Sequence, residues 1–151
     1  MKVKDAMIKD VSAIFEDESI EDFVVACLRK MRTGLPVIDE EYRVIGFLSE
    51  SDVIKSSLPS YFSLLRSASF IPDTHQFMSK LKEIRNDPVS EHMFSPAVTV
   101  KLEDTTLHAA DILIKKGLKT IPVVDDESRL LGYMNRLYLI KVGLEGKINS
   151  E

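Results

Sequence analysis

The sequence of 151 residues is poor in the residues that cross-link proteins or bind metals, with one cysteine and three histidines. A lone cysteine excludes an internal disulfide. Cys27 falls in the apolar run Phe23 to Leu28, and this position is compatible with either a buried structural thiol or a reactive thiol. The histidines lack cysteines or paired acids at metal-ligand spacing. Glycine-rich phosphate loops, nucleophile elbows and dinucleotide fingerprints are missing too. We therefore expect no metal site and no catalysis.

Long apolar runs and excess positive charge are also missing. No stretch approaches the roughly 20 apolar residues of a membrane span, and the N-terminus MKVKDAMIKD lacks the apolar core of a signal peptide. The net charge of −4 does not suit a nucleic-acid binder. These absences predict a cytoplasmic protein without a membrane or nucleic-acid partner.

What the chain does contain is an internal repeat. LPVIDEEYRVIGFLSESDVI (35–54) returns as IPVVDDESRLLGYMNRLYLI (121–140), 86 residues later. Val3 and Met7 recur at the same offset as Val89 and Met93, and Ser19 matches Thr106 at an offset of 87. A copy of about 55 residues would be marginal alone, so the two copies are expected to share a core.

Each copy shows the same succession of patterns. An apolar helical stripe follows Ser19 and Thr106, and a proline-led strand, an acidic turn, a second strand and a second helix come next. Earlier strands are expected near 12–15 and 98–100. The predicted fold is α/β of the α+β kind, strand-helix-strand-strand-helix, with copies at 1–57 and 88–144 and a tail at 145–151.

An insert separates the copies at 58–87. Its apolar content, including Tyr61, Phe62, Phe77 and Leu81, is too high for a flexible linker and predicts two short helices. The sequence is compatible with three roles for this insert: a structural cap, a lid over a cleft, or a surface for docking a partner.

The run Gly46 to Val53 enters the second helix of copy one, with Ser49 at the expected N-cap and Asp52 three residues later. This spacing fits a capping box, and Ser19 with Asp22 shows it at another helix start. It also fits a nucleoside site, because a helix N-terminus attracts phosphate and a carboxylate accepts hydrogen bonds from ribose hydroxyls. Ser51 adds a further hydroxyl.

The repeated strand-Pro-Val-hydrophobic-Asp, followed by Gly-x-x-Ser-x-x-Asp at a helix start, resembles a tandem pair of cystathionine-β-synthase-type (CBS) domains. The resemblance implies a pseudo-twofold pair with two clefts, a homodimer, and a regulatory sensor that binds AMP, ADP, ATP or S-adenosylmethionine and acts on a protein target that the sequence does not indicate. The alternative is a ligand-free interaction module that associates through Val53-Ile54 and Leu137-Leu139-Ile140.

Carried onto this sequence, the resemblance implies that Asp52 binds ribose, with Ser49 and Ser51 near ribose or phosphate. Across the cleft it implies adenine contacts and phosphate contacts from a second group of residues: Ala97, Val98, Lys119 and Thr120, next to Ile121 and Pro122. Lys119 also fits a plain charge at a helix C-terminus.

The second cleft departs from the pattern. Asn135 and Tyr138 replace the serine and the carboxylate, and Thr33-Gly34 offers no cation on the facing side. We expect this cleft to bind weakly or not at all, with Arg136 as the one group that could restore phosphate binding.

Overall fold

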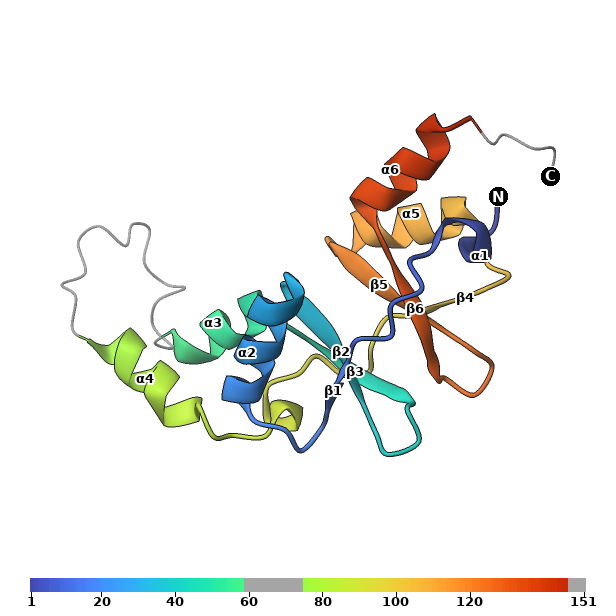
Figure 1. Ribbon diagram of the computed structural model, residues 1–151. Coiled ribbons are helices and arrows are strands. Elements are labelled where there is room, and N and C mark those ends of the chain that lie inside the picture. Colours follow the sequence, from blue (N-terminus) through green and yellow to red (C-terminus); the bar gives the residue numbers. More distant parts are fainter. Residues whose placement is uncertain (59–74, 147–151) are drawn as a thin grey trace.

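The computed structural model describes residues 1–58 and 75–146. Helices and strands appear in the same order in the two halves, as Figure 1 shows. The elements of the first half are α1 (Val3–Ala6), β1 (Ile14–Phe15), α2 (Ile20–Lys30), β2 (Gly34–Ile38), β3 (Val44–Ser49) and α3 (Glu50–Ser57). After the insert helix α4 (Gln76–Ile84) come the 3-10 helix η3 (Val89–Glu91), β4 (Val100–Lys101), α5 (Thr106–Lys115), β5 (Thr120–Val124), β6 (Leu130–Asn135) and α6 (Arg136–Leu144).

Each half is built on a three-stranded sheet. In the first sheet β1 runs parallel to β2, and β2 pairs antiparallel with β3. The second sheet repeats this pairing with β4, β5 and β6, and the register is conserved, since Pro36 faces Phe47 where Pro122 faces Tyr133. The predicted fold class and the order of elements are confirmed.

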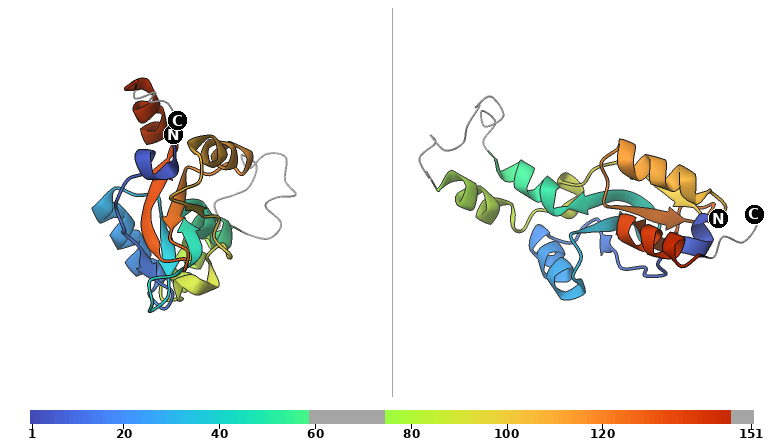
Figure 2. Two further views of the ribbon diagram at one scale, coloured as in Figure 1. Left: turned by 90° about the vertical axis from the view of Figure 1, so that its right-hand side faces the viewer. Right: turned by 90° about the horizontal axis from the view of Figure 1, so that it is seen from above.

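The short segments that precede the sheets are exchanged between the halves. Helix α1 lies beside α5 and α6 of the second half (Figures 1 and 2), where Val3 is fully buried and its amide donates to the carbonyl of Asp104 over 2.8 Å. Val89 of η3 is fully buried in the core of the first half, and its amide donates to Glu18 over 2.8 Å. The expectation of one shared core is therefore corrected: each half has its own core, and each core is completed by residues of the other copy.

Two glycines allow the exchanged segments to cross the sheets. Ile8 and Tyr133 exchange backbone hydrogen bonds of 2.8 and 2.9 Å, and Phe94 and Phe47 do the same over 2.8 and 2.9 Å. A Cβ atom on Gly132 would overlap the carbonyl oxygen of Ile8, and one on Gly46 would lie 2.5 Å from the sulfur of Met93. The close approach of a second backbone explains why both strands carry glycine there.

The helix starts follow the predicted caps with one correction. Ser19 accepts a hydrogen bond from the Asp22 amide in a capping box. In the second half the N-cap is Thr105, which accepts from the His108 amide, so the match of Ser19 to Thr106 is wrong. The 86-residue offset holds at this helix start.

The insert forms at least one helix. Helix α4 packs beside α3, and its Ile84 is buried in the core of the first half with Leu81 packed against it. This agrees with the second of the two predicted helices. The first one, around Tyr61 and Phe62, lies outside the described residues.

Candidate ligand-binding clefts

The start of α3 carries the predicted acidic group. Ser49 is the N-cap, and its hydroxyl oxygen accepts from the Asp52 amide over 3.2 Å. In return Oδ2 of Asp52 accepts from the Ser49 amide over 3.0 Å and from the Ser49 hydroxyl over 2.9 Å. The capping box is thus present, and within the described part of the chain all hydrogen bonds of this carboxylate use Oδ2.

The other residues expected at this cleft differ in exposure. Ser51 is exposed, and Ala97 and Val98 are half-buried in the segment that leads into β4, where Val98 packs on the second core. Ile121 and Pro122 are buried in β5, which leaves their side chains to the protein interior.

Lys119 lies between the two helix starts. Its amine is 3.7 Å from the carboxylate of Glu50, the first residue of α3. It also lines a pocket at the start of α6, together with Thr120. A phosphate held by Lys119 from the α3 side would therefore meet the negative charge of Glu50.

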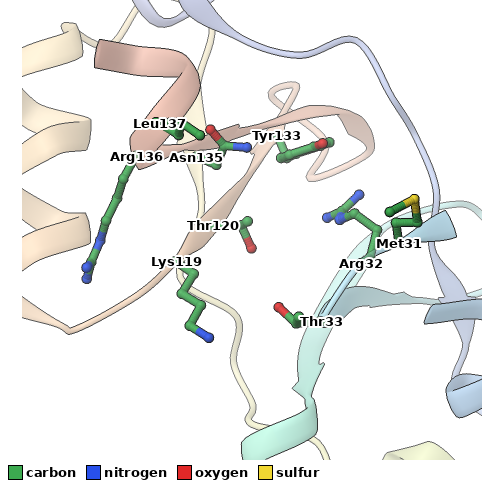
Figure 3. Close-up of a pocket in the computed structure, with 9 residues that line it drawn as sticks. All are labelled: Met31, Arg32, Thr33, Lys119, Thr120, Tyr133, Asn135, Arg136 and Leu137. Atoms are coloured by element: carbon green, nitrogen blue, oxygen red, sulfur yellow. The ribbon is translucent and has the colours of Figure 1, made fainter. Parts of the chain in front are cut away.

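The pocket at the start of α6 is the second cleft, with a volume of about 340 Å³. Figure 3 shows the two halves facing each other across it. Its lining consists of Met31, Arg32 and Thr33 from the first half and Lys119, Thr120, Tyr133, Asn135, Arg136 and Leu137 from the second. None of these nine residues is acidic, and three are cationic.

Arg32 is the residue that the sequence reasoning missed. Its guanidinium lies 3.9 Å from the centre of the Tyr133 ring, a cation–π contact between the halves. Both terminal nitrogens, Nη1 and Nη2, are buried, and neither has a hydrogen-bond partner among the described residues. The expectation that the facing side offers no cation is wrong, because it considered only Thr33 and Gly34 and left out Arg32, the residue directly before them. A test of each basic residue just before the strands that hold Pro36 and Pro122 against both clefts would have found it.

The repeat makes the electrostatic difference between the clefts explicit. At the 86-residue offset, Arg136 stands where Glu50 does and Tyr138 stands where Asp52 does. Asn135 still caps its helix by accepting from the Tyr138 amide over 2.6 Å. One helix start therefore carries two acids, and the other carries a cation and a phenol.

Comparison with known proteins fits this duplicated architecture. The family model "CBS domain" matches residues 3–58 and 89–145. The chain belongs to the CBS domain family. It is 30% identical to the uncharacterized protein MJ1426 of Methanocaldococcus jannaschii, over 93% of this chain and 90% of that protein. Three other curated relatives are longer, and the chain spans 56% to 63% of their length.

Two solved structures share the fold of this CBS pair. CBSX2, from Arabidopsis thaliana, in complex with AMP superimposes with a TM-score of 0.73 at 20% identity, covering 95% of this chain and 96% of that one. The CBS domain pair of MJ0100, in complex with 5′-methylthioadenosine and S-adenosylmethionine, gives 0.67 at 19% identity, covering 97% and 98%.

The CBS pair also has side-chain groups away from its clefts. Asp87, Glu91 and His92 bring their ligand atoms within 4.8 Å of one another, a proximity that the sequence reasoning did not foresee. His92 Nε2 lies 2.9 Å from Asp87 and Nδ1 lies 3.1 Å from the Ser56 hydroxyl, so the ring ties the end of α3 to η3. Both ring nitrogens are thus engaged by the protein itself.

Burial raises the pKa of the Cys27 thiol to about 11, which favours the structural reading of this cysteine. In the described ranges, 1–58 and 75–146, no helix is long and apolar enough to span a bilayer.

Proposed function

We propose that this CBS pair is a non-catalytic regulatory module that binds an adenosine-containing compound in the cleft at the start of α3. Asp52 is the residue on which the proposal depends, because its carboxylate sits in the first turn of α3 and its Oδ2 alone is engaged by the cap. The remaining acceptor capacity suits a ribose diol. Complexes of two structural relatives with AMP and with methylthioadenosine and S-adenosylmethionine support this ligand class.

The arrangement assigns complementary parts to the two halves. Ser49 and Ser51 lie next to Asp52, while Ala97 and Val98 are the proposed adenine contacts and Lys119 with Thr120 the proposed phosphate contacts. Ile121 and Pro122 are buried, so we assign them the role of holding these neighbours in place. Because the Glu50 carboxylate lies beside Lys119, it would repel each phosphate that Lys119 contacts. This repulsion favours adenosine compounds with few phosphates.

Binding regulates only if the ligand distinguishes between two arrangements of the pair. The reciprocal exchange of α1 and η3 couples the halves, so a ligand that contacts both would shift their packing as a unit. The response would then pass to a protein partner or to a second copy of the chain.

A thermal-shift series tests the ligand assignment. Adenosine, methylthioadenosine, S-adenosylmethionine, AMP, ADP and ATP are added singly, and a ligand at about 100 times its Kd adds about 2.7 kcal/mol. For a chain of this length that corresponds to a rise in Tm of roughly 5 to 10 °C. If none of the six compounds moves the Tm, adenosine binding is refuted.

Asp52→Ala and Asp22→Ala form a matched pair of variants. Both remove the carboxylate of a capping box, in α3 and in α2, so both are expected to cost on the order of 1 kcal/mol. Only Asp52→Ala should abolish the ligand-induced shift. An equal shift in both variants would show that the ribose is held elsewhere.

Self-association is a second candidate function, favoured by apolar side chains left on the helix surfaces. The prediction from sequence was partly wrong, since Val53 is buried in the first core and Leu139 packs against the second. Neighbouring helix positions point about 100° apart, so the exposed set is a different one. On these helices it comprises Val24, Val25 and Leu28 on α2, Ile54 on α3, Leu107 and Ile114 on α5, and Leu137, Ile140 and Leu144 on α6.

We propose that these helices form the contact with a second copy of the chain. Ile140→Glu places a charge in the exposed stripe of α6, and light scattering should show a lower mass. Val11→Glu is the control, because Val11 is similarly exposed but lies outside the helices. A wild-type chain that is already monomeric at high concentration would refute the dimer.

A further inference from the structure

We infer that Asp87, Glu91 and His92 form a binding site for a divalent transition-metal ion, with Zn²⁺ as the ion that suits them best. The three residues lie in and around η3, the exchanged segment that completes the core of the first half. The site is outside both clefts, and the inference does not depend on the ligand proposed for the α3 cleft. It departs from the expectation of no metal site, because folding brings together acids that no common ligand spacing in the sequence indicates.

The distances between the three ligand atoms are close to those that an ion needs. One atom from each residue lies within 4.8 Å of the other two, and Nε2 of His92 lies 2.9 Å from Oδ2 of Asp87. Ligands placed about 2.1 Å from a tetrahedral ion are roughly 3.4 Å apart. Small rotations of the two carboxylates therefore suffice to arrange all three atoms around one ion.

The backbone holds this segment firmly on the first half. The amides of Asp87 and His92 donate to the carbonyls of Ile84 and Val89 over 2.9 and 3.0 Å. The side chains of Ile84 and Val89 are both buried in the first core. Because the ligand-bearing backbone is fixed before binding, little conformational entropy is lost when an ion binds.

The ring of His92 has the support that metal-binding histidines use. Its side chain is only 13% exposed, and Nδ1 lies 3.1 Å from the hydroxyl of Ser56 near the end of α3. Metal-ligating histidines usually donate their second ring N–H to an oxygen, which leaves the other nitrogen unprotonated for the ion. A hydroxyl can accept as well as donate. The proton can therefore lie on Nδ1 when an ion replaces the direct contact between Nε2 and Asp87.

The two carboxylates lack the cations that neutralise other acids of the chain. Among residues 1–58 and 75–146, no lysine or arginine forms an ion pair with Asp87 or Glu91, and the one charged partner of Asp87 is the titratable ring of His92. In the first hairpin, by contrast, Arg43 pairs with both Asp39 and Glu41. A divalent ion would neutralise the two negative charges that the protein leaves together here.

The chemistry of the donors decides the class of ion. A histidine nitrogen with two carboxylates suits Zn²⁺ or a neighbouring transition ion such as Co²⁺, whereas Mg²⁺ and Ca²⁺ prefer oxygen ligands alone. With three protein ligands, a tetrahedral ion keeps its fourth position for water. Because the His92 ring also contacts Ser56 of α3, a bound ion would strengthen the link between the exchanged segment and the first half.

Calorimetric titration of the chelator-treated full chain with zinc chloride, in a buffer that does not coordinate metals, tests the inference. Wild-type protein should bind one Zn²⁺ per chain. Glu91→Gln should weaken binding about tenfold or more, and its fold should be unaffected because this side chain is exposed. Glu40→Gln is the matched control, since it removes the same group from an exposed turn, and its affinity should stay within about twofold. Equal losses in the two variants, or no saturable binding to wild type at submillimolar Zn²⁺, would overturn the inference.

A second pair of variants checks the histidine. His92→Gln should lose Zn²⁺ binding, whereas His108→Gln should retain it, since His108 is exposed on α5. Saturating Zn²⁺ should also raise the Tm of wild type by roughly 5 to 10 °C, and excess Mg²⁺ should not reverse this rise. Full binding by His92→Gln, or displacement of Zn²⁺ by Mg²⁺, would assign the ion to other carboxylates and refute the site.

Discussion

The crossing of the N-terminal segment over β6 gives the sharpest test of the fold, through Gly132→Ala. The added methyl group would meet the carbonyl oxygen of Ile8 and lie 2.5 Å from the end of the Met7 side chain. A backbone carbonyl cannot rotate away, so the segment must lift and break the two hydrogen bonds between Ile8 and Tyr133.

The magnitude follows from these contacts. Two backbone hydrogen bonds are worth about 1 kcal/mol each, and overpacking beside a tightly packed segment adds about 1 kcal/mol or more. A loss on the order of 3 kcal/mol in the free energy of unfolding corresponds to a fall in Tm of roughly 6 to 12 °C.

Gly143→Ala is the control for this variant. Gly143 lies near the end of α6 with nothing within 4 Å of its Cβ position, so alanine should leave packing unchanged. Its higher helix propensity adds at most about 1 kcal/mol. Thermal melts report the two Tm values, and hydrogen exchange should speed up at the Ile8 and Tyr133 amides in Gly132→Ala only. A Gly132→Ala melt within about 2 °C of wild type would refute the crossing, since less than 1 kcal/mol would have been lost.

Two further predictions concern ionisable groups. Because burial raises the pKa of Cys27 to about 11, a thiol reagent at pH 8 should label native protein far more slowly than protein in denaturant, and equal rates would contradict the burial. Hydrogen bonds from Lys2 and then Lys4 lower the pKa of Glu103 to about 2, so its contribution to stability is present above about pH 4.5 and is lost as the pH falls toward 2. The Tm difference between wild type and Glu103→Gln should therefore be constant above pH 5 and shrink in acid, and a difference that grows in acid would reverse the assignment.

The sequence predicted the parts of the fold that depend on local patterns. The 86-residue repeat, the hairpins led by Pro36 and Pro122, and the cap at Ser49 all rest on neighbouring residues, and the structure confirms them. The match of Ser19 to Thr106 failed because Thr105 and Thr106 are equally good caps by composition, and only the backbone decides between them.

Features that depend on packing between the halves could not be predicted from the sequence pattern. Val3 and Val89 were recognised as equivalent, but no periodicity tells which of two similar sheets a short segment covers. The same holds for the candidate site, where Asp52 was proposed from the cap pattern of its own helix. Arg32 was missed because its partner Tyr133 lies about 100 residues away, in the other copy.

The exchange of α1 and η3 has a consequence for attempts to divide this protein. A cut within the insert would give two fragments, each with a complete sheet but without the short helix that completes its core. Val3 of α1 would stay with the first sheet, although it belongs to the second core, and Val89 of η3 would stay with the second sheet, although it belongs to the first core. Neither fragment should fold alone, whereas mixing them should restore one native complex that melts in a single transition. The duplicated chain would then behave in calorimetry as one indivisible unit.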